Sequence, residues 1–325
     1  MKILFGIQGT GNGHVSRARD IIPHLQQYAE VDILVSGTQV DVALGHEIKY
    51  RKKGLSFIFG KNGGVDFQKT LNDLGLFTLF NDTRKLDLKP YDFIINDFEP
   101  VSAWAGKWKN KKVIALSHQS AFLSTKSPRP ANINSMAEKI FKYYAPCNDR
   151  FSFHFEAYDK NIFTPIIRRE IREIIPSNNN HYTVYLPAYD DKFLLKYLCA
   201  VKDVQWEIFS KHEKTGYSIE NVTVRPVDNQ SFNKSVATCT GLLTGAGFEA
   251  PAEAMFLGKK VMALPMKGQY EQYCNAEAMR QMGVPIVYEI DESFVTKLKE
   301  WCFNTDAIKV DFPDNVAEVV AKIFI

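Results

Sequence analysis

The chain has 325 residues, of which 45% are hydrophobic and 24% are charged, a composition typical of a globular protein rather than of a fibrous or low-complexity one. Its length exceeds the usual single domain of about 100–200 residues, so we expect two domains. The formal net charge of +3 is too small to indicate nucleic-acid binding by itself, and no such partner is expected.

The first half alternates strand-like and helical patterns. Strands are expected at 2–7, 31–35, 56–60, 91–96 and 112–117, and helices at 14–28 and 100–108. Pro23 should kink or split the first of these helices. The region 61–82, rich in Gly, Asn and aromatic residues, is expected to be a loop-rich insertion. Because strands that alternate with helices form parallel βαβ units, this half predicts a parallel sheet.

A second series of strands and helices follows the polar tract 177–180, which is expected to be a linker or an exposed loop. Strands are expected at 181–186, 205–210, 222–226, 242–244 and 260–264, and helices at 190–199, 249–257 and 272–281. The last residues, 314–325, form an amphipathic helical pattern directly after Pro313. Such a helix needs an apolar surface to cover.

The cysteine pattern and the hydropathy indicate the compartment. Five cysteines are widely spaced and form no CxxC pair, which disfavours a zinc or redox motif and suits a reducing compartment. No apolar run reaches the roughly 20 residues that span a bilayer. The opening MKILFGIQGTG reads as a buried strand rather than a signal peptide. We therefore expect a cytoplasmic protein.

A glycine-rich turn follows the first expected strand. Gly9, Gly11 and Gly13 alternate along it, and His14 comes next. Such a turn before a helix often cradles a phosphate, although its glycines can simply allow close packing of strand and helix. The dinucleotide fingerprint fails here, because the third glycine comes one residue early and no acid ends the second strand. Neither a nicotinamide nor a flavin cofactor is expected.

His14 and Asp97 are both expected at the carboxyl edge of the first sheet, where open α/β sheets hold ligands. A helix amino terminus disfavours imidazolium, so His14 should be neutral and able to act as a general base. The carboxylate of Asp97 could fix its tautomer. Alternatively, His14 could merely cap its helix or pack in the core. Asp97, or Glu99 in its place, could cap the helix that begins near residue 100.

A second candidate site lies in the stretch 241–276. An expected strand ends in Thr244-Gly245-Ala246-Gly247, and a helix then starts near Glu249, so its free amides could bind a diphosphate. Glu253 lies about one turn into this helix, where a carboxylate suits the two hydroxyls of a ribose. Further polar side chains, suited to sugar hydroxyls, come from Glu271, Gln272 and Asn275.

This stretch resembles the nucleotide-sugar-binding motif of GT-B glycosyltransferases, both the MurG-like enzymes and the UDP-glucuronosyl/glucosyltransferase group. Glu253 follows Gly247 by the family's six residues, and EQYCNA at 271–276 fits the last element of the motif. The segment GTGNGH resembles the family's GGTGGH-type loop, with His14 on its histidine. The segments SHQSA at 117–121 and INDFEP at 95–100 are similar to further family segments, the latter supplying the dyad aspartate.

The resemblance implies an α/β fold of two doubly wound Rossmann-like domains that face each other across a cleft. Residues 1–165 would bind the acceptor and 166–313 the nucleotide sugar, with the helix 314–325 packing back on the first domain. The implied reaction is inverting transfer of a sugar, from UDP as the family-level expectation, to an acceptor hydroxyl. No cofactor is implied, and no Asp-x-Asp stands in a plausible donor position, so no obligatory metal is expected.

Carried over residue by residue, the resemblance implies a role for each candidate. His14 would be the base and Asp97 its partner. The phosphate turn lacks the family's histidine and any cation, so positive charge could come from Arg17, Arg168 or Arg225. The donor would contact Gly245, Ala246, Gly247, Phe248, Glu253, Glu271, Gln272 and Asn275. The acceptor side would include Gly11, Gly13 and His118, although His118 could equally be a hydrogen-bonded loop residue.

Two other functions remain open. A nucleotide-sugar epimerase could use the same architecture, and a protein that only binds nucleotide sugars could retain these residues without turnover. The acceptor could be a carbohydrate, a lipid-linked molecule or a small molecule. The aromatic segments 57–67 and 141–144 could pack in the core. MurG-like behaviour would instead bring one of them, with Lys52, Lys53 or Lys142, into peripheral contact with the inner face of a membrane.

Overall fold

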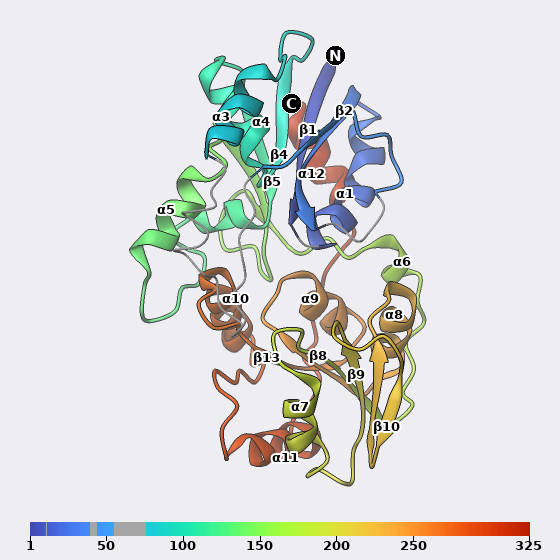
Figure 1. Ribbon diagram of the computed structural model, residues 1–325. Coiled ribbons are helices and arrows are strands. Elements are labelled where there is room, and N and C mark those ends of the chain that lie inside the picture. The colour runs from blue at the N-terminus through green and yellow to red at the C-terminus, as the bar shows by residue number, and fades with distance from the viewer. Residues whose placement is uncertain (11, 40–43, 55–75) are drawn as a thin grey trace.

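Two parallel sheets, one above the other in Figure 1, organise the protein. The computed structural model describes residues 1–10, 12–39, 44–54 and 76–325. Within them the first sheet has seven strands in the order β3-β2-β1-β4-β5-β6-β7, and every neighbouring pair is parallel. The strands are β1 Lys2–Thr10, β2 Glu30–Gln39, β3 Tyr50–Lys52, β4 Phe93–Asp97, β5 Val113–Ser117, β6 Asp149–Phe153 and β7 Ile162–Phe163.

Alternate residues of β1 pack on opposite faces of this sheet, as the two-residue period of a strand requires. Ile3 and Phe5 belong to the apolar cluster that includes α1 and α12, while Leu4 belongs to the cluster under α3 and α4. This double burial explains the continuous apolar run in the sequence. The helices of this part are α1 Asn12–Leu25, α3 Leu76–Lys85, α4 Pro100–Trp108, the 3₁₀ helix η1 Gln119–Leu123, α5 Ser135–Tyr143 and α12 Val316–Ile323.

The second sheet has the order β10-β11-β9-β8-β12-β13 in the described residues and is parallel except for the β10–β11 pair. Its strands are β8 His181–Tyr185, β9 Gln205–Ser210, β10 Tyr217–Ile219, β11 Val222–Pro226, β12 Gly241–Gly245 and β13 Lys260–Leu264. The short α6 Arg169–Arg172 precedes them. The helices that cover the second sheet are α7 Asp191–Leu198, α8 Asn229–Thr238, α9 Glu249–Phe256, α10 Tyr270–Gln281 and α11 Phe294–Asn304.

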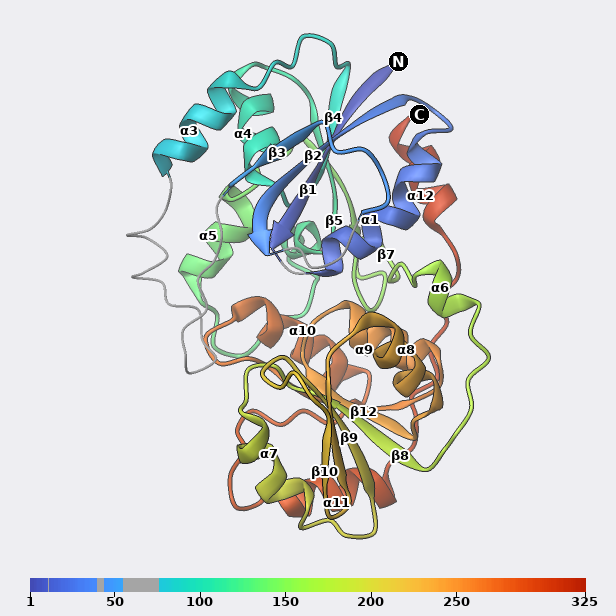
Figure 2. The ribbon, with the colours of Figure 1, turned by 45° about the vertical axis from the view of Figure 1, so that its right-hand side comes forward.

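The helices α9 and α10 lie on the side of the second sheet that faces the first sheet (Figures 1 and 2). One buried apolar cluster runs from β1 and α1 to α9 and α10. After α11 the chain returns to the first sheet, where α12 lies beside α1 and Phe324 stacks on Tyr28 with ring centroids 4.8 Å apart. The apolar face of α12 therefore packs against α1.

Several predicted elements differ from the structure. The expected strand 56–60 and most of the loop-rich region 61–82 lie outside the described residues. Residues 76–85, however, form the helix α3 rather than a loop, because Leu79 packs into the apolar cluster with α4. Pro23 does not split α1, which ends two residues later at Leu25. Helix α11 was not predicted, although Phe294, Leu298 and Trp301 occupy its buried face at helical spacing.

Candidate active site

His14 and Asp97 meet at the carboxyl edge of the first sheet. Asp97 ends β4, His14 lies in the first turn of α1, and the Nδ1 atom of His14 is 3.0 Å from Oδ1 of Asp97. Asp97 is fully buried. The capping role belongs to Glu99 instead, whose carboxylate accepts hydrogen bonds from the backbone of Val101 and Ser102 at the start of α4. The predicted pairing of imidazole and carboxylate is thus present in the geometry.

Arg17 is a third member of this group that the sequence did not single out as a partner of Asp97. Its Nη2 donates to both oxygens of Asp97, at 2.7 and 2.8 Å, and lies 3.2 Å from Nδ1 of His14. Burial acts to raise the pKa of Asp97, but Arg17 and His14 outweigh it and hold that pKa below its ordinary value. The sequence signal for this partnership was the spacing of three residues between His14 and Arg17, which puts both on the same face of a helix.

The glycines of the first turn have different surroundings. Gly11 lies outside the described residues. Gly9 packs closely against Gly37 of β2, because a Cβ on Gly37 would lie 2.5 Å from the backbone of Gly9. Gly37 also has a φ of +132°, which favours glycine. Close packing of the two strands therefore explains this part of the turn. A Cβ on Gly13 would lie 2.7 Å from the carboxylate of Glu249. The space beside Gly13, expected for an acceptor, is therefore filled by a side chain of the second half.

The second turn connects β12 to α9. The amide of Ala246 donates to the carbonyl of Leu264 at 3.2 Å, so it is not free for a diphosphate, contrary to the expectation for that residue. A Cβ on Gly247 would meet nothing within 4 Å, which leaves the backbone open there. Phe248, the N-cap residue of α9, instead stacks on His118 at 3.8 Å between ring centroids. In this turn the open space thus lies beside Gly247.

Glu253 is buried in α9, and Arg168 from the segment between the sheets binds it. Arg168 donates through Nε and Nη2 to the two carboxylate oxygens, at 2.6 and 2.7 Å. Burial raises the pKa of Glu253 above its ordinary value even though Arg168 acts to lower it. Both oxygens that were expected to hold a ribose are engaged here by a guanidinium, so Arg168 is the candidate cation nearest this carboxylate. Arg225 pairs with Glu207 instead.

His118 lies at the contact between the two halves rather than in an open acceptor site. Its side chain is 1% exposed, Nδ1 lies 2.8 Å from the carbonyl of Phe153, and Nε2 lies 2.9 Å from Oδ1 of Asn275 in α10. Burial lowers the pKa of His118. The amide of Asn275 in turn donates to the carbonyl of Ala246 at 3.2 Å. His118 is thus a hydrogen-bonded residue between β5 and η1, as the alternative to an acceptor role expects.

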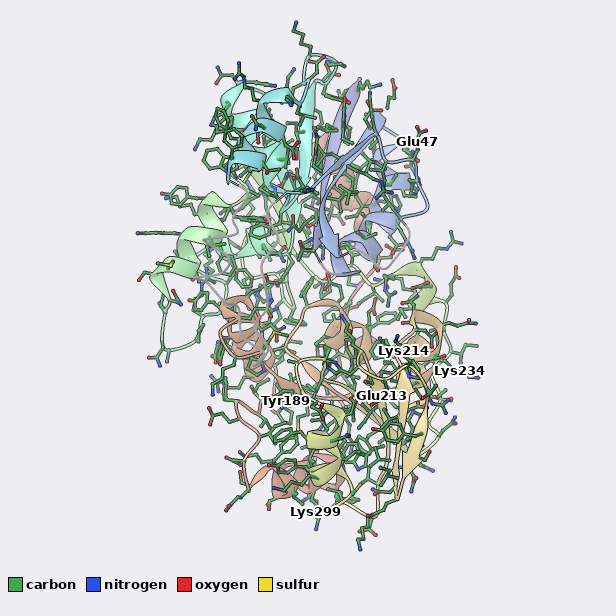
Figure 3. All side chains as sticks on the ribbon, in the orientation of Figure 1. Glu47, Tyr189, Glu213, Lys214, Lys234 and Lys299 are labelled. Atoms are coloured by element: carbon green, nitrogen blue, oxygen red, sulfur yellow. The ribbon has the colours of Figure 1, made fainter. Side chains whose placement is uncertain are left out.

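The two other polar residues of α10 also have protein partners. Oε1 of Glu271 accepts a hydrogen bond from Nε2 of Gln119 at 3.1 Å, and Oε1 of Gln272 accepts one from the amide of Met266 at 2.8 Å. A cavity of about 500 Å³ adjoins this turn at the carboxyl edge of the second sheet. Tyr189, labelled in Figure 3, lines it together with Met266 and Lys267. The cavity thus adjoins the predicted donor motif through Met266 and Lys267, and none of the predicted donor-binding residues lines it.

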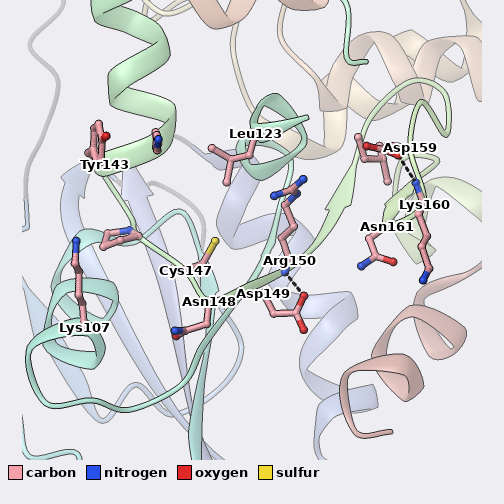
Figure 4. Close-up of a pocket in the computed structure, with 13 residues that line it drawn as sticks. Lys107, Leu123, Tyr143, Cys147, Asn148, Asp149, Arg150, Asp159, Lys160 and Asn161 are labelled. Carbon is pink, nitrogen blue, oxygen red and sulfur yellow. Dashed lines mark hydrogen bonds between the residues drawn. The ribbon is translucent and has the colours of Figure 1, made fainter. Parts of the chain in front are cut away.

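A larger cavity, of about 690 Å³, lies in the first half between α5, β6 and the β6–β7 loop (Figure 4). Lys107, Arg150 and Lys160 line it, and none of the candidate catalytic, donor-binding or acceptor-side residues does. In the described part of the chain, no group of three or more His, Cys, Asp or Glu side chains is placed to hold a metal ion. None of the described helices is long and apolar enough to cross a membrane.

Comparisons with known proteins agree with this architecture. The model of a family described as "Glycosyl transferase family 1" matches residues 1–303. A search of curated proteins gave no match. MurG of Acinetobacter baumannii is 14% identical and has a TM-score of 0.58, with 99% of this chain and 95% of that chain covered.

Two further solved structures have the same arrangement. The spinosyn rhamnosyltransferase SpnG complexed with thymidine diphosphate is 11% identical, with a TM-score of 0.56 and coverage of 99% and 95%. A UDP-N-acetylglucosamine 2-epimerase is 13% identical, with a TM-score of 0.59 and coverage of 100% and 94%. Together with the two parallel sheets, these similarities confirm the predicted GT-B fold.

Proposed function

This chain belongs to glycosyl transferase family 1, and we propose that it transfers a sugar from a nucleotide diphosphate, UDP in the first instance, to an acceptor hydroxyl with inversion at the anomeric carbon. Residues 1–165 hold the acceptor, and residues 166–313 hold the donor. The reaction needs no obligatory metal ion. The observation that carries the proposal is the His14–Asp97 pair, which lies beside the amino terminus of α9 through the contact of Gly13 with Glu249.

On the acceptor side, His14 acts as the general base. Asp97 accepts a hydrogen bond from Nδ1, so Nε2 is left to take the proton of the acceptor hydroxyl. The acceptor oxygen then bonds to the anomeric carbon as the bond from that carbon to the diphosphate oxygen breaks. The bonding electrons leave with the diphosphate, and the configuration at the carbon inverts.

On the donor side, free amides at the start of α9 stabilise the departing diphosphate. Gly247 supports this role because its backbone is unobstructed. Ribose binding at Glu253 requires the hydroxyls to share or displace its two bonds from Arg168. A displaced Arg168 would bring a cation toward the diphosphate, which supplies the charge that the turn itself lacks. Gln272 and Glu271 would contact the donor from α10.

The first experiment is calorimetric binding of UDP, GDP and dTDP to the wild type and to Glu253→Ala. Glu318→Ala serves as the matched control, because Glu318 is 65% exposed on α12. We expect one nucleotide to bind the wild type and the control, with at least a tenfold loss in Glu253→Ala. Absence of binding by all three nucleotides would contradict the proposal.

The second experiment tests the base. With the donor identified, His14→Ala should lower kcat by about 10²–10⁴-fold, the range typical of general base catalysis. His212→Ala, at an exposed position far along the chain in the second half, is the control and should retain activity. Full activity of His14→Ala would remove His14 from the mechanism.

The similarity to an epimerase keeps a second candidate function in view, since the two activities use one fold. An epimerase turns over its nucleotide sugar without an acceptor, whereas a transferase consumes donor in proportion to acceptor. Incubating the donor alone and separating its sugar epimers distinguishes them. Binding without either turnover would instead support a protein that only binds nucleotide sugars.

A lipid-linked acceptor would bring the protein to a membrane surface. Exposed apolar side chains on α4 and α5, namely Trp108, Met136 and Tyr143, support such contact, and Lys107 and Lys142 add positive charge beside them. Sedimentation with vesicles of phosphatidylglycerol and phosphatidylcholine tests it. We expect binding that weakens in Trp108→Ser, and equal binding by the variant would exclude this surface.

A further inference from the structure

A buried arginine joins the His14–Asp97 pair to the second domain. Arg17 is 2% exposed and lies one turn after His14 in α1. Its Nη2 bonds both oxygens of Asp97, and its Nη1 donates to Oε1 of Glu249 in α9. Because α1 packs on the first sheet and α9 on the second, one guanidinium bridges the two halves of the protein.

A glycine makes this contact feasible. Glu249 lies against the backbone of Gly13, where a Cβ would come within 2.7 Å of Oε2 and 2.8 Å of the carboxyl carbon. Any larger residue would therefore push the Glu249 carboxylate away from Arg17. Glu249 also begins α9, where a helix amino terminus favours a negative charge. Gly13, Arg17 and Glu249 thus form one contact between the two halves of the protein.

The charges in this group oppose one another. Burial acts to lower the pKa of Arg17, but Asp97 and Glu249 raise it above its ordinary value, so the guanidinium is a permanent cation. Its Nη2 lies 3.2 Å from Nδ1 of His14. The carboxylates of Asp97, Glu249 and, at longer range, Glu271 surround this cation.

We propose that Arg17 is a positioning residue, which fixes the Asp97 carboxylate and through it orients the imidazole of His14. Arg17 has its full set of partners only when Glu249 reaches it across the domain boundary. Contact between the domains and readiness of the base are therefore coupled through one side chain. This inference rests on the proposed function for the role of His14 as a base.

The test follows the ring nitrogens of His14 by ¹⁵N NMR, at a pH well above the ordinary imidazole range, in Arg17→Met, Arg17→Lys and Glu249→Gln, with the signals assigned by their loss in His14→Gln. In the wild type the contact with Asp97 should keep the ring proton on Nδ1. Arg17→Met frees the Asp97 carboxylate to turn, so the proton should be shared between Nδ1 and Nε2, and Glu249→Gln should give a smaller change in the same direction. Arg17→Lys should lie between the wild type and Arg17→Met, and the control Arg169→Met should match the wild type, because Arg169 is 84% exposed.

Activity provides the second measurement. With a donor and acceptor in hand, Arg17→Met should lower kcat at least tenfold while KM changes less than threefold, and Arg17→Lys should restore part of kcat. Ring ¹⁵N signals that match the wild type in both Arg17→Met and Glu249→Gln would overturn the inference. If Arg17→Met does not fold, Glu249→Gln still decides it. Because the NMR measurement needs no substrate, its result is independent of whether the proposed transferase activity is found.

Discussion

The ion pair between Arg168 and Glu253 gives a prediction that the structure makes quantitative. Arg168→Met keeps an apolar stem but removes two charge-assisted bonds, of 2.6 and 2.7 Å, from a carboxylate that is 6% exposed. Breaking one partner of a buried pair typically destabilises a protein by about 3–5 kcal/mol. Because the Arg168 side chain is 12% exposed and water can partly replace it, we expect about 3 kcal/mol.

The assay is urea unfolding of the wild type, Arg168→Met, Glu253→Met and the double variant. The double variant should be more stable than Arg168→Met, because it leaves no buried charge without a partner. Arg280→Met, which removes an exposed pair with Glu277 on α10, should change the free energy of unfolding by less than about 1 kcal/mol.

The loss of stability in Arg168→Met should depend on pH in a direction that can be checked. Burial raises the pKa of Glu253 in the folded protein, so its contribution to stability is fully present below the ordinary glutamate range and is lost as pH rises through the folded pKa. Without Arg168 that pKa should rise further. The deficit of Arg168→Met should consequently be largest near pH 8 and shrink toward pH 5. A deficit below about 0.5 kcal/mol at pH 8, or one that grows on acidification, would refute the reasoning.

Three further predictions concern the first half of the chain. Glu99→Ala removes the cap of α4 and should destabilise the protein by about 1–2 kcal/mol in urea unfolding; no change would show that the cap is dispensable. Gly13→Ala should displace Glu249 and lower kcat by at least tenfold with little loss of stability, and unchanged turnover would contradict the close contact. Arg17 and His14 outweigh burial and hold the pKa of Asp97 below its ordinary value. The Asp97 carboxylate therefore stabilises the folded protein above the ordinary aspartate range, and this stabilisation is lost as pH falls through the folded pKa. Asp97→Asn should flatten this acid-side loss in unfolding measured from pH 3 to 7, and a loss as steep as in the wild type would exclude Asp97 as its source.

Much of the fold follows from local sequence patterns. The continuous apolar runs in the sequence correspond to β1, β4, β12 and β13, which are parallel strands covered on both faces. Such runs are typical of parallel sheets between two layers of helices. The glycine turns mark where strands pass into helices, and they place His14 and Gly247 at the carboxyl edges of the two sheets. The motif that contains Glu253 and Asn275 identified the family, and the family model over residues 1–303 confirmed it.

The sequence by itself thus determined the two sheets, the family and the side chains that stand at the sheet edges, because each depends on short-range periodicity and spacing. Only the tertiary structure decided which of those side chains become partners. Arg17 with Glu249 and His118 with Asn275 are separated by more than 150 residues, and Arg168 reaches Glu253 from a segment with no recognisable motif. Local patterns carry no information about such pairs, since only the packing of elements that are distant in the chain brings these side chains together.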